Sequence, residues 1–118
     1  MAVSEPPVLD GVALERLRRI GGASLVRRMV ELYLANGPER VRSLREGAAA
    51  GDVARVEQAA HTMKSSAGNL GAVRLQRTAE ALEASAGRGA IDEKLVARLV
   101  REYADSAGAL RSALEEET

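Results

Sequence analysis

The sequence contains no cysteine, phenylalanine or tryptophan, and its only large aromatic rings are those of Tyr33 and Tyr103. The absence of cysteine excludes disulfides, thiolate chemistry and the zinc sites that need thiolate ligands. His61 is the only histidine, so a metal site built from several imidazoles is excluded as well. A core with so few rings must be filled by Leu, Val, Ala and Met, which favours closely packed helices over a sheet.

The chain also lacks an excess of charge of either sign, since 17 Lys and Arg residues stand against 17 Asp and Glu residues. Nucleic-acid-binding domains usually carry a basic excess, so the composition argues against that kind of partner. No apolar run approaches the roughly 20 residues of a membrane span, and the N-terminus has no signal-peptide pattern. We therefore expect a cytoplasmic protein of one domain, with neither a nucleic-acid nor a membrane partner.

Strand signals are missing, whereas apolar residues recur at spacings of three and four along most of the chain. This period predicts a short helix after Asp10 that stops at Gly21-Gly22, and a long helix over about 23–50 that is kinked at Pro38. Two separate helices meeting at Pro38 are the alternative. Further helices are expected over about 53–69, from Leu75 to Ala86, and over about 91–114.

Four long amphipathic helices joined by short connections predict an all-α fold, an antiparallel up-and-down four-helix bundle with a short extra N-terminal helix over one end. The bundle is expected over residues 9–114, after a flexible lead-in over 1–8 and before a frayed acidic tail over 115–118. No apolar face remains once such a core is filled, so we expect a monomer. The glycine pairs lack the pattern of a phosphate-binding loop and are interpreted as helix stops.

On a helical wheel, His61 lies roughly 140° from the centre of its helix's apolar stripe and is therefore expected to point into solvent. Lys64 follows one turn later, which places a cation beside the imidazole. A neutral ring nitrogen is a nucleophile near neutral pH, and an adjacent ammonium suits a phosphoryl group. The same features also fit an ordinary solvated surface histidine, so geometry alone leaves both interpretations open.

The residues around His61 on this face are predicted to form a docking surface, because small side chains there let another protein bring a carboxylate close. Besides Lys64, the surface comprises Ala54, Glu57, Gln58, Ser65 and Gly68. A glycine inside a helix costs roughly 1 kcal/mol relative to alanine, so Gly68 needs a reason. Close approach of a partner is one reason, and termination of the helix near Leu70 is the other.

Residues 60–72, AHTMKSSAGNLGA, closely resemble the signature of histidine-containing phosphotransfer (HPt) domains, His-Thr-Leu-Lys-Gly-Ser-Ser/Ala followed shortly by Leu-Gly-Ala. The resemblance extends over roughly residues 9–114. It includes Gly51-Asp52, Leu32-Tyr33, Leu82-Glu83 and Gly87-Arg88. One departure is Ser65, which stands where the family commonly has glycine.

The resemblance implies that His61 exchanges a phosphoryl group with an aspartate on a response-regulator receiver domain or takes it from a histidine kinase. It also implies that Lys64 neutralises the phosphoryl group and that Glu83 orients the imidazole through a hydrogen bond. The magnesium ion of the exchange belongs to the receiver, so we expect no metal or cofactor in this chain.

The first interpretation of the function is therefore a phosphorelay intermediate of two-component signalling. Such a protein is a phosphocarrier and not an enzyme, because the sequence shows no nucleotide-binding element. The alternatives are the phosphoacceptor domain of a chemotaxis-type kinase and a helical adaptor that works without phosphorylation.

Overall fold

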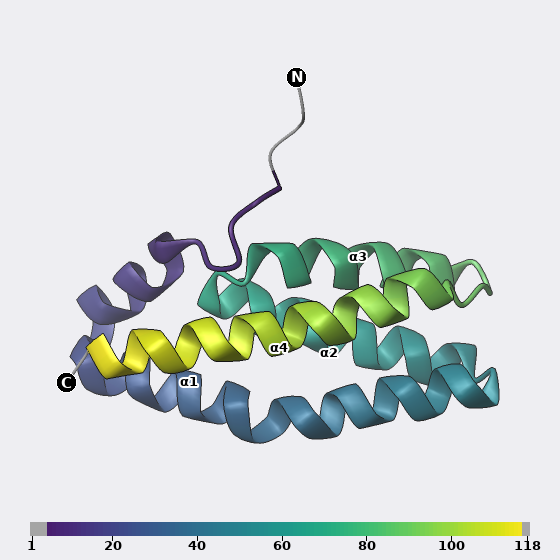
Figure 1. Cartoon of the computed structure of the whole chain (residues 1–118), viewed down its shortest axis with the longest axis horizontal. Helices are drawn as coiled ribbons and strands as arrows, with labels where there is room; N and C mark the ends of the chain where they lie inside the picture. The colour runs from purple at the N-terminus through teal and green to yellow at the C-terminus, as the bar shows by residue number, and fades with distance from the viewer. Residues whose placement is uncertain (1–4, 117–118) are drawn as a thin grey trace.

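In the computed structural model, which describes residues 5–116, all regular secondary structure is helical. The order is α1 (Gly11–Ala50), α2 (Val53–Leu70), α3 (Val73–Gly87) and α4 (Glu93–Glu116). The helices run side by side along the long axis of the molecule (Figure 1), and each packs against the next, with α4 returning to α1. The predicted all-α four-helix bundle is confirmed.

The first part of α1 is a separate helical segment that lies over one end of the bundle. It begins at Asp10, whose side chain accepts a hydrogen bond from the Val12 N–H at 2.9 Å. At Gly22 the backbone is not helical, with φ 72° and ψ −170°, a conformation that favours glycine. The chain changes direction there (Figure 1), so the predicted stop at Gly21-Gly22 is confirmed.

The N-terminal segment is attached to the turn between α2 and α3. The Asp10 N–H donates to the Gly71 carbonyl at 2.7 Å, and a β-carbon at Gly71 would lie 2.4 Å from the Asp10 carbonyl oxygen. Arg74 donates to the Pro6 carbonyl and lies 3.8 Å from the Glu5 carboxylate. The lead-in over 1–8 thus contacts α3 through residues 5 and 6, while residues 1–4 lie outside the described part of the chain.

Pro38 lies inside α1 without ending it, because Gly22 is the only residue of α1 with non-helical angles. A single helix over 23–50 is confirmed, and two helices meeting at Pro38 are not found. Tyr103 of α4 packs directly on the α1 backbone at this point, since a β-carbon at Gly37 would lie 1.8 Å from its hydroxyl oxygen. The hydroxyl donates to the Tyr33 carbonyl at 3.2 Å, and the Tyr33 hydroxyl lies 2.8 Å from that of Ser106.

Leu, Val and Ala fill the rest of the core, as the composition predicts. The largest fully buried apolar side chains are Leu44, Leu70, Leu75, Leu82, Leu99, Leu110, Val26, Val30 and Val56. The rings of Tyr33 and Tyr103 are in contact, with centroids 5.3 Å apart, and burial raises the pKa of Tyr33 above its ordinary value. None of the helices within residues 5–116 has the length and hydropathy of a membrane span.

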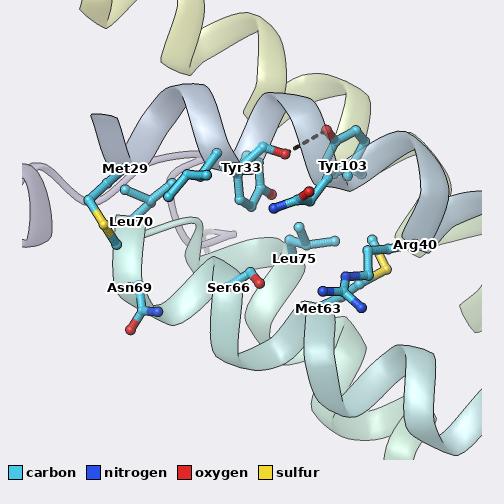
Figure 2. A pocket seen from close by; sticks show the side chains of 12 residues that line it. Met29, Tyr33, Arg40, Met63, Ser66, Asn69, Leu70, Leu75 and Tyr103 are labelled. Atoms are coloured by element: carbon cyan, nitrogen blue, oxygen red, sulfur yellow. Dashed lines mark hydrogen bonds between the residues drawn. The ribbon is translucent and has the colours of Figure 1, made fainter. Parts of the chain in front are cut away.

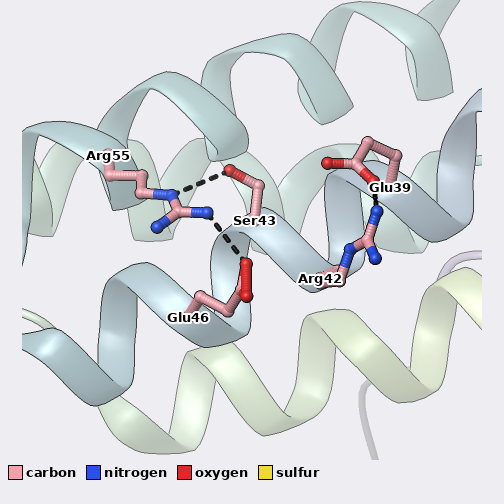
Figure 3. Close-up of polar contacts among 5 residues, drawn as sticks. All are labelled: Glu39, Arg42, Ser43, Glu46 and Arg55. Carbon is pink, nitrogen blue, oxygen red and sulfur yellow. Dashed lines mark hydrogen bonds and ion pairs between the residues drawn. The ribbon is translucent and has the colours of Figure 1, made fainter.

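Both ends of α2 are capped. The Asp52 side chain accepts from the Arg55 N–H at 3.1 Å, and α2 ends at Gly71, whose φ of 75° closes it in the left-handed region. The Arg55 side chain ties α2 to α1 by donating to Ser43 at 3.2 Å and to Glu46 at 2.9 Å (Figure 3). An ion pair of Arg42 with Glu39 lies within α1 in the same view. The start and end of the helix that carries His61 are therefore well defined.

Candidate functional site

His61 projects from the middle of α2 into solvent. Its side chain is 56% exposed, whereas its neighbour Ala60 and the residues two positions to either side, Ala59 and Met63, are buried against the other helices. The predicted outward orientation of the imidazole is confirmed. It follows from the period of α2 alone, since an apolar stripe that faces the core leaves the opposite face to the polar residues.

The carboxylate of Glu83, on α3, joins the imidazole to the ammonium of Lys64. Its Oε2 lies 2.6 Å from His61 Nδ1, and its Oε1 lies 2.6 Å from Lys64 Nζ. Each carboxylate oxygen therefore contacts one of the two side chains. The Glu83 side chain is 22% exposed and the Lys64 side chain 31%, so both are partly shielded from solvent. The contact of Glu83 with the imidazole was implied by the family resemblance, whereas the ion pair of Lys64 with Glu83 was not expected.

The ion pair reinforces the charged forms of Glu83 and Lys64. The pKa of Glu83 lies below its ordinary value, mainly because Lys64 donates a hydrogen bond to it and to a smaller extent because of His61, while desolvation opposes both. The pKa of Lys64 is raised, mainly by the same hydrogen bond to Glu83. A carboxylate and an ammonium are thus both present beside the imidazole. Because the carboxylate can only accept, His61 donates through Nδ1, and in the neutral ring the lone pair is then on Nε2.

Side chains meet along the antiparallel seam between α2 and α3 in a regular register. Glu57 faces Gly87, where a β-carbon would lie 3.0 Å from its Oε2, and His61 faces Glu83. Further along, Gly68 faces Gln76 of α3, since a β-carbon at Gly68 would lie 2.9 Å from the Gln76 Nε2. From one pair to the next, the residue number rises in α2 by as much as it falls in α3.

The structure places four of the predicted docking residues at exposed positions around His61. These are Ala54, Glu57, Gln58 and Ser65. Gly68 differs, because it is only partly exposed and the end of the Gln76 side chain covers the position of its missing side chain. The predicted end of the helix near Leu70 is found, and Gly68 lies in the last turn of α2, although its own φ is not positive and it does not itself make the turn. Gln76 was not predicted from the sequence. Its spacing of seven residues from Glu83 equals the spacing from His61 to Gly68, and in antiparallel helices this equality is the signal that places Gln76 beside Gly68.

On the side of α2 that faces α1 lies an open pocket of about 110 Å³ (Figure 2). Its lining includes Tyr33, Leu70 and Leu75, and Met29 and Arg40 lie toward opposite ends of it. His61 does not line this pocket, so the imidazole is open to solvent and not held in a cavity. Within residues 5–116 no cluster of three or more His, Cys, Asp or Glu side chains is arranged to hold a metal ion.

An exposed imidazole on a four-helix bundle, held at one nitrogen by a carboxylate and flanked by an ammonium, defines the class of histidine phosphoacceptor modules. The Hpt domain family model matches residues 28–116, and the chain belongs to this family. It is similar in structure to histidine-containing phosphotransfer protein B (HptB) from Pseudomonas aeruginosa PAO1, with a TM-score of 0.86 and 27% sequence identity over 95% of this chain and 98% of that one. No curated protein matches the sequence.

Family membership and this structural likeness make the chain a phosphocarrier, an intermediate of phosphoryl transfer in two-component signalling. The first interpretation of the sequence is thereby confirmed, and the kinase-domain and adaptor alternatives are not favoured. Hpt proteins interact with histidine kinases and response regulators, so the partners of this chain belong to these classes.

Proposed function

We propose that His61 accepts the phosphoryl group on Nε2 and exchanges it with the aspartate of a receiver domain. The observation that carries this proposal is the 2.6 Å contact of His61 Nδ1 with Glu83, which engages one ring nitrogen and leaves the other for reaction. The exposure of the imidazole supports it, because a receiver must bring its own reacting carboxylate to the same atom.

In the reaction, the Nε2 lone pair attacks the phosphorus of the receiver's aspartyl phosphate. The N–P bond forms, the bond from phosphorus to the aspartate oxygen breaks, and the aspartate leaves as a carboxylate. The ring keeps its proton on Nδ1 and therefore becomes positively charged while the phosphoryl group is attached. Glu83 accepts from that nitrogen and balances the new charge. The return of the phosphoryl group to an aspartate is the same step in reverse.

Lys64 is proposed to stabilise the phosphoryl oxygens. In the unphosphorylated site its ammonium is bound to Glu83 Oε1, on the carboxylate whose other oxygen contacts His61. Both contacts to one carboxylate keep the ammonium close to the ring. A cation held near the place where negative charge develops lowers the barrier to transfer, because no large rearrangement is needed to bring it there.

The receiver is proposed to dock over Ala54, Glu57, Gln58, Ser65 and Gly68, around the imidazole. The hydroxymethyl group of Ser65 is small and exposed, so it takes little space where the family commonly has glycine. We further propose that the protein acts as a cytoplasmic monomer that binds neither nucleic acid nor membranes. Sedimentation velocity over a range of concentrations tests the oligomeric state.

His61→Gln tests the assignment of the acceptor. Purified receiver domains, phosphorylated with acetyl phosphate and Mg²⁺ and radiolabelled, are mixed with the wild-type protein to find one that exchanges phosphate with it. The wild type should take up acid-labile label, and His61→Gln should take up none. Its melting temperature should stay close to that of the wild type, since an exposed polar substitution usually changes stability by within about 0.5 kcal/mol. Label retained by a folded His61→Gln protein would show that another residue accepts the phosphate.

A further inference from the structure

The carboxamide of Gln76 lies between α2 and α3, on the same side as His61 and Glu83, and no atom of the described residues forms a hydrogen bond with it. It rests against Gly68, with its Nε2 2.9 Å from where a β-carbon would be. Within residues 5–116 the Gln76 side chain has no hydrogen-bond partner, and it is not among the fully buried unsatisfied groups, so solvent reaches it. A donor and an acceptor are therefore both presented at a partly buried position, where a second protein can replace water.

The position lies within reach of any protein that docks on His61. Gly68 follows His61 by two helical turns, which places the carboxamide about 10 Å along the seam from the imidazole. A standard interface covers about 800 Å² on each partner, equivalent to a disc about 16 Å in radius. A receiver centred on His61 thus covers Gln76, and it meets this side chain in place of the bare backbone of Gly68.

We infer that Gln76 is a docking residue, whose carboxamide hydrogen-bonds to the receiver domain while the receiver reacts with His61. This inference rests on the proposed function, because it takes the receiver as the partner. Gly68 has an indirect part: the absence of its side chain gives the Gln76 carboxamide its place over α2. Gln76 does not touch the imidazole or the phosphoryl group, so it acts on the affinity for the receiver and not on the chemical step.

Two single substitutions test the inference from opposite sides of the contact. Gln76→Ala removes the carboxamide, and Gly68→Ala displaces it, because the new β-carbon takes its place. Each should raise the receiver concentration for half-maximal transfer by about three- to tenfold, the range expected for one hydrogen bond. The rate at saturating receiver should not change. The double variant should be no worse than either single variant, because both lose the same hydrogen bond.

Gly108→Ala is the matched control. Gly108 lies in α4, is exposed, and has nothing within 4 Å of where its β-carbon would be, so the substitution makes the same chemical change away from the seam. It should leave transfer unchanged. The proteins are assayed with the labelled receiver that exchanges most rapidly with the wild type, and their melting temperatures are measured in parallel.

Three results would overturn the inference. Unchanged half-maximal concentrations in both single variants would show that the receiver does not contact Gln76. A lower saturating rate or a lower melting temperature of Gln76→Ala would assign the residue to the internal structure of the seam. Failure of every receiver to exchange phosphate with the wild type would remove the proposed function and the inference together, whereas normal exchange in all variants would remove the inference alone.

Discussion

Replacing Glu83 by glutamine removes one charge from the site and keeps a hydrogen-bond acceptor of nearly the same shape. On the proposed mechanism the imidazole becomes positively charged when it is phosphorylated, and in the structure the carboxylate lies 2.6 Å from its Nδ1. Two unit charges about 4 Å apart attract by about 1 kcal/mol in water and about 4 kcal/mol at an effective dielectric constant of 20. The imidazole is largely solvated and the carboxylate is shared with Lys64, so the lower end of this range applies.

About 1.4 kcal/mol corresponds to a factor of ten in an equilibrium constant. Glu83→Gln should therefore shift the equilibrium between phosphorylated His61 and the phosphorylated receiver by about tenfold toward the receiver. The assay mixes labelled receiver with each variant, lets the exchange reach equilibrium, and separates the two proteins to compare their label. Glu83→Ala, which also loses the acceptor, should be at least as impaired. An equilibrium in Glu83→Gln equal to that of the wild type would refute the argument, since it would mean that the carboxylate does not sense the charge on the ring.

Three further predictions follow from the ion pair and from the packing of α1 on α4. Lys64→Ala should slow single-turnover transfer by about ten- to a hundredfold without abolishing it, and Lys64→Arg should recover part of the rate. The ion pair lowers the pKa of Glu83 and raises that of Lys64, so its contribution to stability is fully present between about pH 5 and pH 10. The contribution is lost as the pH falls through the pKa of Glu83, and it is lost again as the pH rises through the pKa of Lys64. The unfolding free energies of the wild type and of Lys64→Ala should therefore differ between about pH 5 and pH 10, and the difference should vanish as the pH moves well below or well above this range. Gly37→Ala forces Tyr103 out of its place on α1 and should lower the unfolding free energy by about 1–3 kcal/mol, whereas Gly108→Ala, with free space around it, should not lower it.

Features that depend on neighbouring residues in the chain were predictable from the sequence. Asp52 caps α2 because a short acidic side chain can reach the free N–H groups of the first turn, and Gly71 closes the helix because glycine adopts positive φ without strain. The exposure of His61 follows in the same way from the period of the apolar residues around it. These are local effects, so a helical wheel and the rules for helix ends are enough to find them.

Contacts between helices were predictable only in part. The family resemblance implied that Glu83 meets His61, but nothing in the spacing within α2 shows that Lys64 binds the same carboxylate. Tyr103 lies on Gly37 although the two are far apart in the chain, and its position depends on how α4 is set against α1. Such contacts depend on the distance and rotation between helices, which no single helix encodes. Pro38 was ambiguous for the same reason, since surrounding packing decides whether a helix with proline continues.

On the proposed mechanism, the shared carboxylate of Glu83 lets one small site accommodate both the free and the phosphorylated state of His61. Before transfer, the imidazole and the ammonium of Lys64 face one carboxylate, and the charge of the ammonium balances that of the carboxylate. Phosphorylation adds a group of charge about −2 while the ring gains one positive charge, so the site as a whole changes by only about −1. The imidazolium then binds Glu83 more strongly than the neutral ring did, and the phosphoryl oxygens attract Lys64 away from it. On this mechanism each cation has an anionic partner in both states, which limits the difference in free energy between them.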